Sequence, residues 1–69
     1  MLSKIYILTF NHREPSVYPD QIEFRTQAEA EEALKMYSED GDIYSSIILS
    51  EYDYRWNSER IIRAQTLTA

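Results

Sequence analysis

Hydrophobic and polar positions divide the chain into segments of different periodicity. Residues 4–10 are rich in β-branched and aromatic side chains at both parities, which predicts a strand in mid-sheet or covered on both faces. Residues 21–25 alternate, with Ile22 and Phe24 on one side, which predicts a half-buried strand. Residues 11–20 contain both prolines and little periodicity, so they predict a loop between the two strands.

A helix is predicted for residues 27–39. Thr26 and Glu29 have the spacing of a capping box, in which each side chain accepts from the other's backbone N–H. Glu31 and Lys35 can pair one turn apart, and Gly41 is placed for a left-handed cap after the last turn. One apolar stripe follows helical spacing and consists of Ala30, Ala33, Leu34 and Tyr37.

The remaining residues predict two more strands, over 42–56 and 59–67, joined by a tight turn at Asn57 and Ser58. Apolar positions in the first change parity, from Ile43, Ile47 and Leu49 to Tyr52, Tyr54 and Trp56, and a bulge or bend near Ser50 would reconcile them. The resulting ββαββ order predicts an α+β fold: a mostly antiparallel sheet of three to four strands with one helix packed on one face. Hydrophobic pattern leaves the strand order open.

The length of 69 residues predicts a single domain, 1–69, with a thin core, because so short a chain hides only about 60% of its unfolded surface. Cysteine is absent from the sequence, so no disulfide supports this core and we expect a homo-oligomer, in the simplest case a homodimer. The longest apolar run, residues 47–49, is too short to span a membrane. The first residues lead directly into a strand pattern, so we expect no signal peptide and a cytoplasmic location.

Acidic residues are concentrated in one part of the sequence. The net charge is −5. The charges within residues 1–20 cancel one another, and so do the charges within residues 43–69. The imbalance therefore lies in residues 21–42, where only Arg25 and Lys35 oppose the carboxylates. A negative edge of this kind repels a phosphate backbone, so we expect no direct binding of nucleic acid.

Catalytic and metal-binding patterns are weak. His12 beside Glu14 could act as a general base, but no nucleophile signature or glycine-rich phosphate loop accompanies it. Glu39, Asp40 and Asp42 surround Gly41, yet this cluster lacks the loop length and the downstream ligand of a calcium-binding hand. We therefore expect a protein that is not an enzyme and that has no metal site and no cofactor.

Two groups of residues are candidates for binding a protein partner. The acidic set could mimic nucleic-acid phosphates and occupy the basic groove of a nucleic-acid-binding protein; it consists of Glu29, Glu31, Glu32, Glu39, Asp40 and Asp42. Tyr52, Tyr54 and Trp56 concentrate aromatic area of the kind that anchors interfaces. The competing interpretations are a charged helix face that serves solubility and rings that complete a small core.

The layout also resembles a class of known proteins. A strand, the run T-x-A-E-A-E-E-A-L and two further strands, in an acidic chain without cysteine, resemble small phage-encoded accessory proteins that bind and inhibit host or defence factors. The resemblance implies a protein-binding inhibitor or modulator. The second hypothesis is a structural homodimer in which Tyr52, Tyr54 and Trp56 pair across a two-fold axis.

Overall fold

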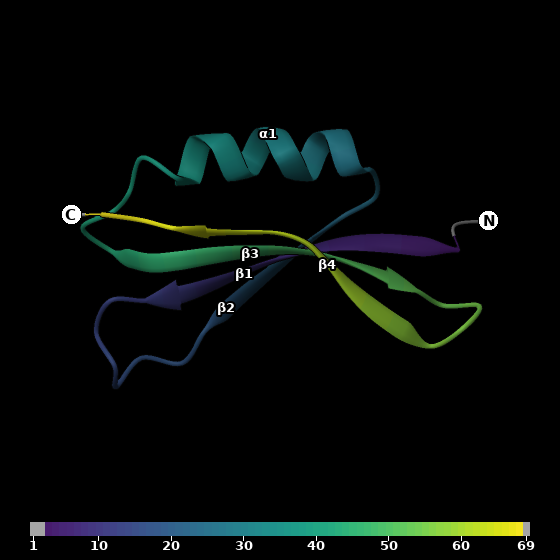
Figure 1. Cartoon of the computed structure of the whole chain (residues 1–69), viewed down its shortest axis with the longest axis horizontal. Helices are drawn as coiled ribbons and strands as arrows, with labels where there is room; N and C mark the ends of the chain where they lie inside the picture. Colours follow the sequence, from purple (N-terminus) through teal and green to yellow (C-terminus); the bar gives the residue numbers. More distant parts are fainter. Residues whose placement is uncertain (1–2, 69) are drawn as a thin grey trace.

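The computed structural model describes residues 3–68 and contains one sheet and one helix. The elements are β1 (Lys4–His12), β2 (Asp20–Phe24), α1 (Gln27–Tyr37), β3 (Tyr44–Asp53) and β4 (Ser58–Thr66). The strands form a four-stranded sheet in the order β2-β1-β3-β4, with every neighbouring pair antiparallel, and α1 lies on one face (Figure 1). The predicted α+β fold and ββαββ order are confirmed. Met1 and Leu2, on which the expected absence of a signal peptide depends, lie outside the described residues.

The start of α1 is capped by Thr26. Its Oγ1 accepts from the Glu29 backbone N–H at 3.2 Å and donates to the Glu29 carboxylate at 3.0 Å. The predicted cap is therefore present, although the carboxylate meets the threonine hydroxyl and not its backbone N–H. The predicted apolar stripe faces the sheet, with Ala30 and Leu34 buried.

The end of α1 differs from the prediction. The helix ends at Tyr37, and the backbone N–H of the C-cap residue Ser38 donates to the Leu34 carbonyl at 2.9 Å. Ser38 keeps helical angles, and Gly41 does not have the positive φ that a left-handed cap requires. Gly41 is instead buried, and its carbonyl accepts a hydrogen bond from Arg13.

The predicted irregularity near Ser50 exists, but the extra residue is in β4. Between Leu49 and Ser50 the register with β4 shifts, so that Leu49 pairs with Arg63 and Ser50 with Ile61, leaving Ile62 as the additional residue. Against β1 the register of β3 continues without a break from Ser46 to Asp53. The apolar parity changes because Ile47 and Leu49 face α1, whereas Tyr52 lies on the opposite face of the sheet.

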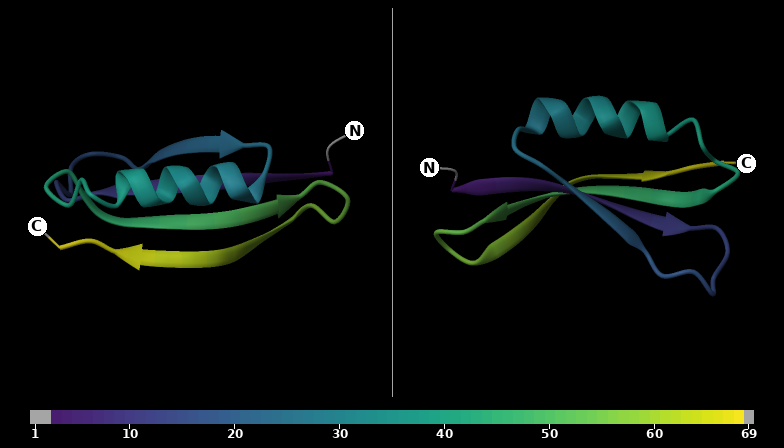
Figure 2. Two further views of the ribbon diagram at one scale, coloured as in Figure 1. Left: turned by 90° about the horizontal axis from the view of Figure 1, so that it is seen from above. Right: turned by 180° about the vertical axis from the view of Figure 1, so that it is seen from behind.

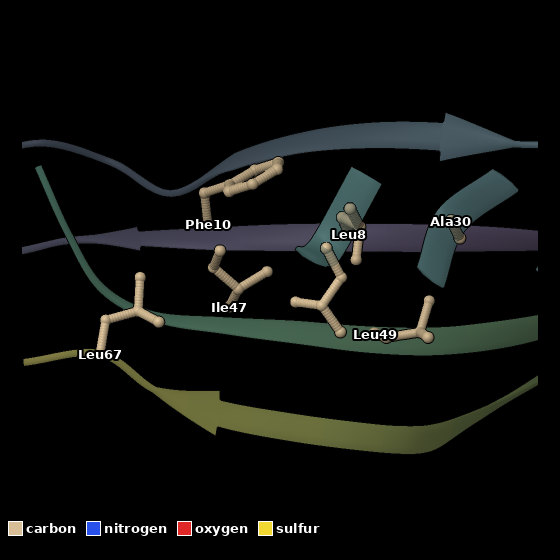
Figure 3. Packing of buried hydrophobic residues seen from close by; sticks show 7 residues of the cluster. Leu8, Phe10, Ala30, Ile47, Leu49 and Leu67 are labelled. Atoms are coloured by element: carbon tan, nitrogen blue, oxygen red, sulfur yellow. The ribbon is translucent and has the colours of Figure 1, made fainter. Parts of the chain in front are cut away.

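The core lies between α1 and the centre of the sheet. Leu8 pairs with Leu49 and Phe10 with Ile47 across β1 and β3, and all four side chains are at most 1% exposed (Figure 3). Ala30 and Leu34 of α1 and Leu67 complete this cluster. Burying one such aliphatic side chain contributes about 1.5–3 kcal/mol. The mid-sheet position predicted for residues 4–10 is confirmed, because β1 lies between β2 and β3.

Strand β1 continues beyond its apolar residues. Asn11 Nδ2 donates to Ser46 Oγ at 2.9 Å, and the Ser45 hydroxyl donates to the Asn11 carbonyl at 3.2 Å. These contacts place Asn11 and His12 in β1, so the connection to β2 spans residues 13–19 and is shorter than the predicted loop of residues 11–20. Polar contacts with β3 therefore stabilise the end of β1, which the hydrophobic pattern of the sequence does not predict.

The sheet is strongly twisted, and α1 covers only part of it. Seen from above, α1 lies over β1 with β2 and β3 on either side, and β4 lies outside it (Figure 2). The β1–β2 and β3–β4 hairpins bend away from the helix at opposite ends of the sheet (Figure 1). Within residues 3–68, no second layer covers the face opposite α1.

Candidate interaction surfaces

The β3–β4 hairpin ends in a turn of residues 54–57, here called the hairpin tip. Asn57 has φ of 48° and is the one non-glycine residue with positive φ in the part of the chain that the structure describes. Asparagine tolerates this left-handed region better than most residues. The Tyr52 hydroxyl donates to the Asn57 side-chain carbonyl, and the Tyr54 N–H donates to the Ser3 carbonyl at 2.8 Å. The tip is therefore tied to β3 and to the start of β1.

Asp53 and Arg55 hold the first half of the hairpin tip. The Asp53 carboxylate accepts from the Arg55 backbone N–H at 2.9 Å, from its Nε at 3.2 Å and from its Nη2 at 3.0 Å. The side-chain hydrogen bonds from Arg55 lower the pKa of Asp53 below its ordinary value, and the same contact raises the pKa of Arg55. This ion pair restrains the chain between the two exposed aromatic residues.

Aromatic side chains project from this tip. Tyr52 is half-buried and meets Tyr54 edge to face, with ring centroids 5.1 Å apart. Tyr54 is 55% exposed and Trp56 is 75% exposed, although both rings are large and apolar. The alternative that some of the rings complete the core does not apply to Tyr54 and Trp56. Exposed aromatic groups on a turn restrained by the Asp53–Arg55 ion pair are suited to insertion into a pocket of a partner.

The acidic set is divided between internal and solvent-facing roles. Glu29 caps α1, and Glu31 pairs with Arg63 of β4, with an Nη2–Oε1 distance of 2.9 Å. The predicted partner of Glu31 was Lys35, but the structure places the carboxylate against β4 instead. The remaining members of the set are exposed; they are Glu32, Glu39, Asp40 and Asp42.

The structure does not bring the acidic set and the aromatic residues together. The loop after α1, which carries Glu39, Asp40 and Asp42, lies at the end of the molecule that holds the C-terminus (Figure 1). The hairpin tip lies at the opposite end of a molecule that is 39 Å long. A single small contact surface cannot include both ends, so Glu39, Asp40 and Asp42 are a candidate separate from the hairpin tip, and α1, which carries Glu29, Glu31 and Glu32, lies between the two ends.

His12 lies in a third region, at the end of β1, where its ring is 5.2 Å from that of Tyr44. Its Nε2 is 2.8 Å from Asp20 Oδ2, whereas Glu14 accepts from the Ser16 hydroxyl at 3.1 Å. The pairing of His12 with Glu14 considered from the sequence is therefore absent. The neighbouring Tyr44 has a raised pKa, because its hydroxyl is partly desolvated and faces the Asp20 carboxylate.

A shallow groove of about 340 Å³ separates α1 from β4, because the helix does not lie over that strand. It is lined by Glu31, Leu34, Lys35, Ser38, Arg63 and Gln65. Its charges have both signs, and the Glu31–Arg63 ion pair spans it. Among residues 3–68, no group of three or more His, Cys, Asp or Glu side chains is placed to hold a metal ion.

The sequence interpretation missed Arg13. Its Nε donates to the Gly41 carbonyl at 2.8 Å, and its Nη2 donates to the carbonyls of Tyr44 at 3.2 Å and Leu67 at 2.9 Å. One side chain thus connects the β1–β2 loop, the loop before β3 and the C-terminal segment. Carbonyl acceptors carry no sequence signature, so no pattern could have indicated this role.

Comparisons of the chain with protein families, with curated proteins and with solved structures find no match. No helix in residues 3–68 combines the length and apolar character that crossing a lipid bilayer requires.

Proposed function

We propose that this chain is a non-enzymatic protein-binding module that inhibits or modulates its partner, with the hairpin tip as the anchor of the contact. The observation that carries the proposal is the exposure of Tyr54 and Trp56 on a turn restrained by the Asp53–Arg55 ion pair. A side chain that is already held in its binding conformation loses little entropy when a partner covers it. Exposed Trp and Tyr with this restraint are the residue types that dominate interface energies.

The charge of the chain supports a partner with a basic contact surface. The net charge is −5, and Glu32, Glu39, Asp40 and Asp42 are exposed. Negative charge of this size increases the rate of encounter with a positive surface, and salt screens the effect. A nucleic-acid-binding protein of a host or defence system has such a surface, in keeping with the phage-encoded inhibitors that the layout resembles. We place the interaction in the cytoplasm.

The two groups have different roles in this proposal. In this proposal the hairpin tip supplies the buried contact, and the acidic residues, of which Glu39, Asp40 and Asp42 lie at the opposite end of the molecule, supply steering. Truncating a buried aromatic anchor increases the dissociation rate, whereas reversing a rim charge changes the association rate and its salt dependence. The roles can therefore be separated by experiment.

The proposal is tested by capture of partners from host lysate on the immobilised full chain, compared with Trp56→Ala and with Tyr18→Ala. Tyr18 is the matched control, since it is an 88% exposed aromatic residue in the β1–β2 loop, at the other end of the molecule. We expect Trp56→Ala to lose the captured protein and Tyr18→Ala to retain it. Equal capture by both variants would refute the hairpin tip as the anchor.

A companion variant tests the steering role. Glu32→Lys reverses an exposed charge that does not cap the helix or form an ion pair within residues 3–68. We expect capture at low salt to fall while the dissociation rate stays unchanged. A change confined to the dissociation rate would instead place Glu32 inside the contact.

A further inference from the structure

The face of the sheet opposite α1 has an apolar centre. Leu8 and Leu49 point toward the helix, so the side chains of their sequence neighbours point away from it. Residues that pair across β1, β3 and β4 form rows on this side of the sheet. One row consists of Ile7, Ser50 and Ile61, and the next consists of Thr9, Ile48 and Ala64. We call this surface the open face; its apolar members are Ile5, Ile7, Ile48, Tyr52, Ile61 and Ala64.

The two central rows of the open face have no charged residue on β1, β3 or β4. One carboxylate reaches them from the adjoining row, where Glu59 accepts a hydrogen bond from the Ser50 hydroxyl at 2.6 Å. Glu23 pairs with Ile7 from β2 and therefore lies toward the margin of the face. A chain with a net charge of −5 repels its own copies over most of its surface, and this repulsion is weaker over the mainly apolar central rows than over the acidic side chains of α1.

The shape of the sheet suits a copy of itself. The strands twist strongly, so one pair of opposite corners of the sheet bends toward α1 and the other pair bends away from it (Figure 2). Such a surface has the shape of a saddle. If a second copy of the sheet is rotated by 180° about a line along the strands, its open face turns toward the first copy and has the complementary curvature. Two identical twisted sheets can therefore meet face to face without gaps, as the sheets of a sandwich do at about 30°.

We infer that the open face is covered by a second copy of this chain, in a dimer with two-fold symmetry. The Cα atoms extend 39 Å along the strands and 15 Å across them. With side chains added, this face offers an area on the order of the 800 Å² per partner that specific interfaces bury. The dimer gives β1 the second covered face that its apolar residues at both parities, including Ile5 and Ile7, indicate.

The inferred interface differs from the one expected from the sequence. That expectation placed Tyr52, Tyr54 and Trp56 at the two-fold axis, whereas the inferred centre is formed by the isoleucines of β1, β3 and β4. Tyr52 lies in the same row as Ile5 and Glu59, nearer the hairpin tip. Tyr54 and Trp56 stay available for another partner, so this inference does not rest on the proposed function.

Sedimentation velocity of the full chain at low to high micromolar concentration tests the inference, with Ile61→Glu as the disrupting variant. Ile61 is 63% exposed in the single chain, so the substitution leaves the fold intact but buries an unpaired carboxylate in the dimer. Ile43→Glu is the matched control, because Ile43 is 52% exposed and lies outside the open face. We expect a dimer for the wild type and Ile43→Glu, and a dissociation constant raised about tenfold or more for Ile61→Glu.

A second disrupting variant, Ala64→Arg, places a long charged side chain on the same exposed strand of the open face. It must also dissociate the dimer, and it decides the test if circular dichroism shows that Ile61→Glu is unfolded. A monomeric wild type at high micromolar concentration would overturn the inference. If both Ile61→Glu and Ala64→Arg remained dimeric, the inference would also be overturned, because the dimer would then form through another surface, such as the β4 edge or the hairpin tip.

Discussion

The guanidinium of Arg13 donates through Nη2 to the carbonyl of Leu67 at 2.9 Å, across 54 positions of sequence. Its Nε reaches the Gly41 carbonyl at 2.8 Å, and its backbone N–H reaches the Ile43 carbonyl at 2.9 Å. This residue therefore closes the end of the molecule where the helix loop and the C-terminal segment meet. The clamp holds Leu67, which is one of the seven buried apolar side chains among residues 3–68.

Replacing Arg13 with alanine is expected to lower the free energy of unfolding by about 1.5–3 kcal/mol, the range for hydrogen bonds made by a charged group. Arg13→Lys should recover only part of this loss, because one ammonium cannot reproduce the planar fork. Urea denaturation measures both. Arg25→Ala is the control, since Arg25 forms no ion pair with residues 3–68. Equal losses for Arg13→Ala and Arg25→Ala would exclude the clamp.

The Asp53–Arg55 contact makes stability depend on acid pH. The ordinary pKa of the Asp53 carboxyl is 3.8, and the hydrogen bonds from Arg55 lower it in the folded protein. Unfolded chains therefore bind the proton more readily, so this contribution is complete above pH 3.8 and is lost as pH falls through the lower, folded pKa. Thermal unfolding of Arg55→Ala should show a smaller loss of midpoint below pH 3.8 than the wild type. If the thermal midpoints of the two proteins fell equally with decreasing pH, the Asp53–Arg55 contact would not be the source of the acid dependence.

The partner of Glu31 can be decided by a double-mutant cycle. The structure pairs Glu31 with Arg63 at 2.9 Å across the groove, and the helical spacing of the sequence pairs it with Lys35. We expect a coupling energy of about 0.2–1 kcal/mol between Glu31 and Arg63, typical of an exposed ion pair. The cycle of Glu31 with Lys35 should give a coupling near zero. A larger coupling energy between Glu31 and Lys35 would mean that Glu31 pairs along the helix in solution and not with Arg63 across the groove.

Most of the fold could be predicted because its elements have distinct periodicities. The alternation around Ile22, the helical stripe of Ala30 and Leu34 and the mixed parity of residues 4–10 each identify an element that the structure contains. The irregularity near Ser50 was predicted, but the parity change that indicated it has another cause. Tyr52 was assumed to face the core, whereas it points to the opposite side, and apolar pattern alone does not tell one face of a sheet from the other.

Less of the candidate site could be predicted. Sequence composition indicated which aromatic and acidic residues could matter, but the separation of the hairpin tip from Glu39, Asp40 and Asp42 by the length of the molecule depends on the strand order and the path of the hairpins. Exposure of Trp56 depends on its place in a turn that the Asp53–Arg55 pair restrains, a contact between residues two positions apart. The role of Arg13 depends entirely on backbone carbonyls that the fold brings together.

The most direct test of the central claim is site-specific photocrosslinking in host lysate, with a photoreactive phenylalanine derivative replacing Trp56 in one sample and Tyr18 in another. Both positions carry exposed aromatic side chains, so incorporation itself is equally tolerated. We expect a covalent adduct with a partner protein from position 56 and none from position 18. Adducts from position 18 alone, or from position 56 only with another copy of this chain, would contradict it.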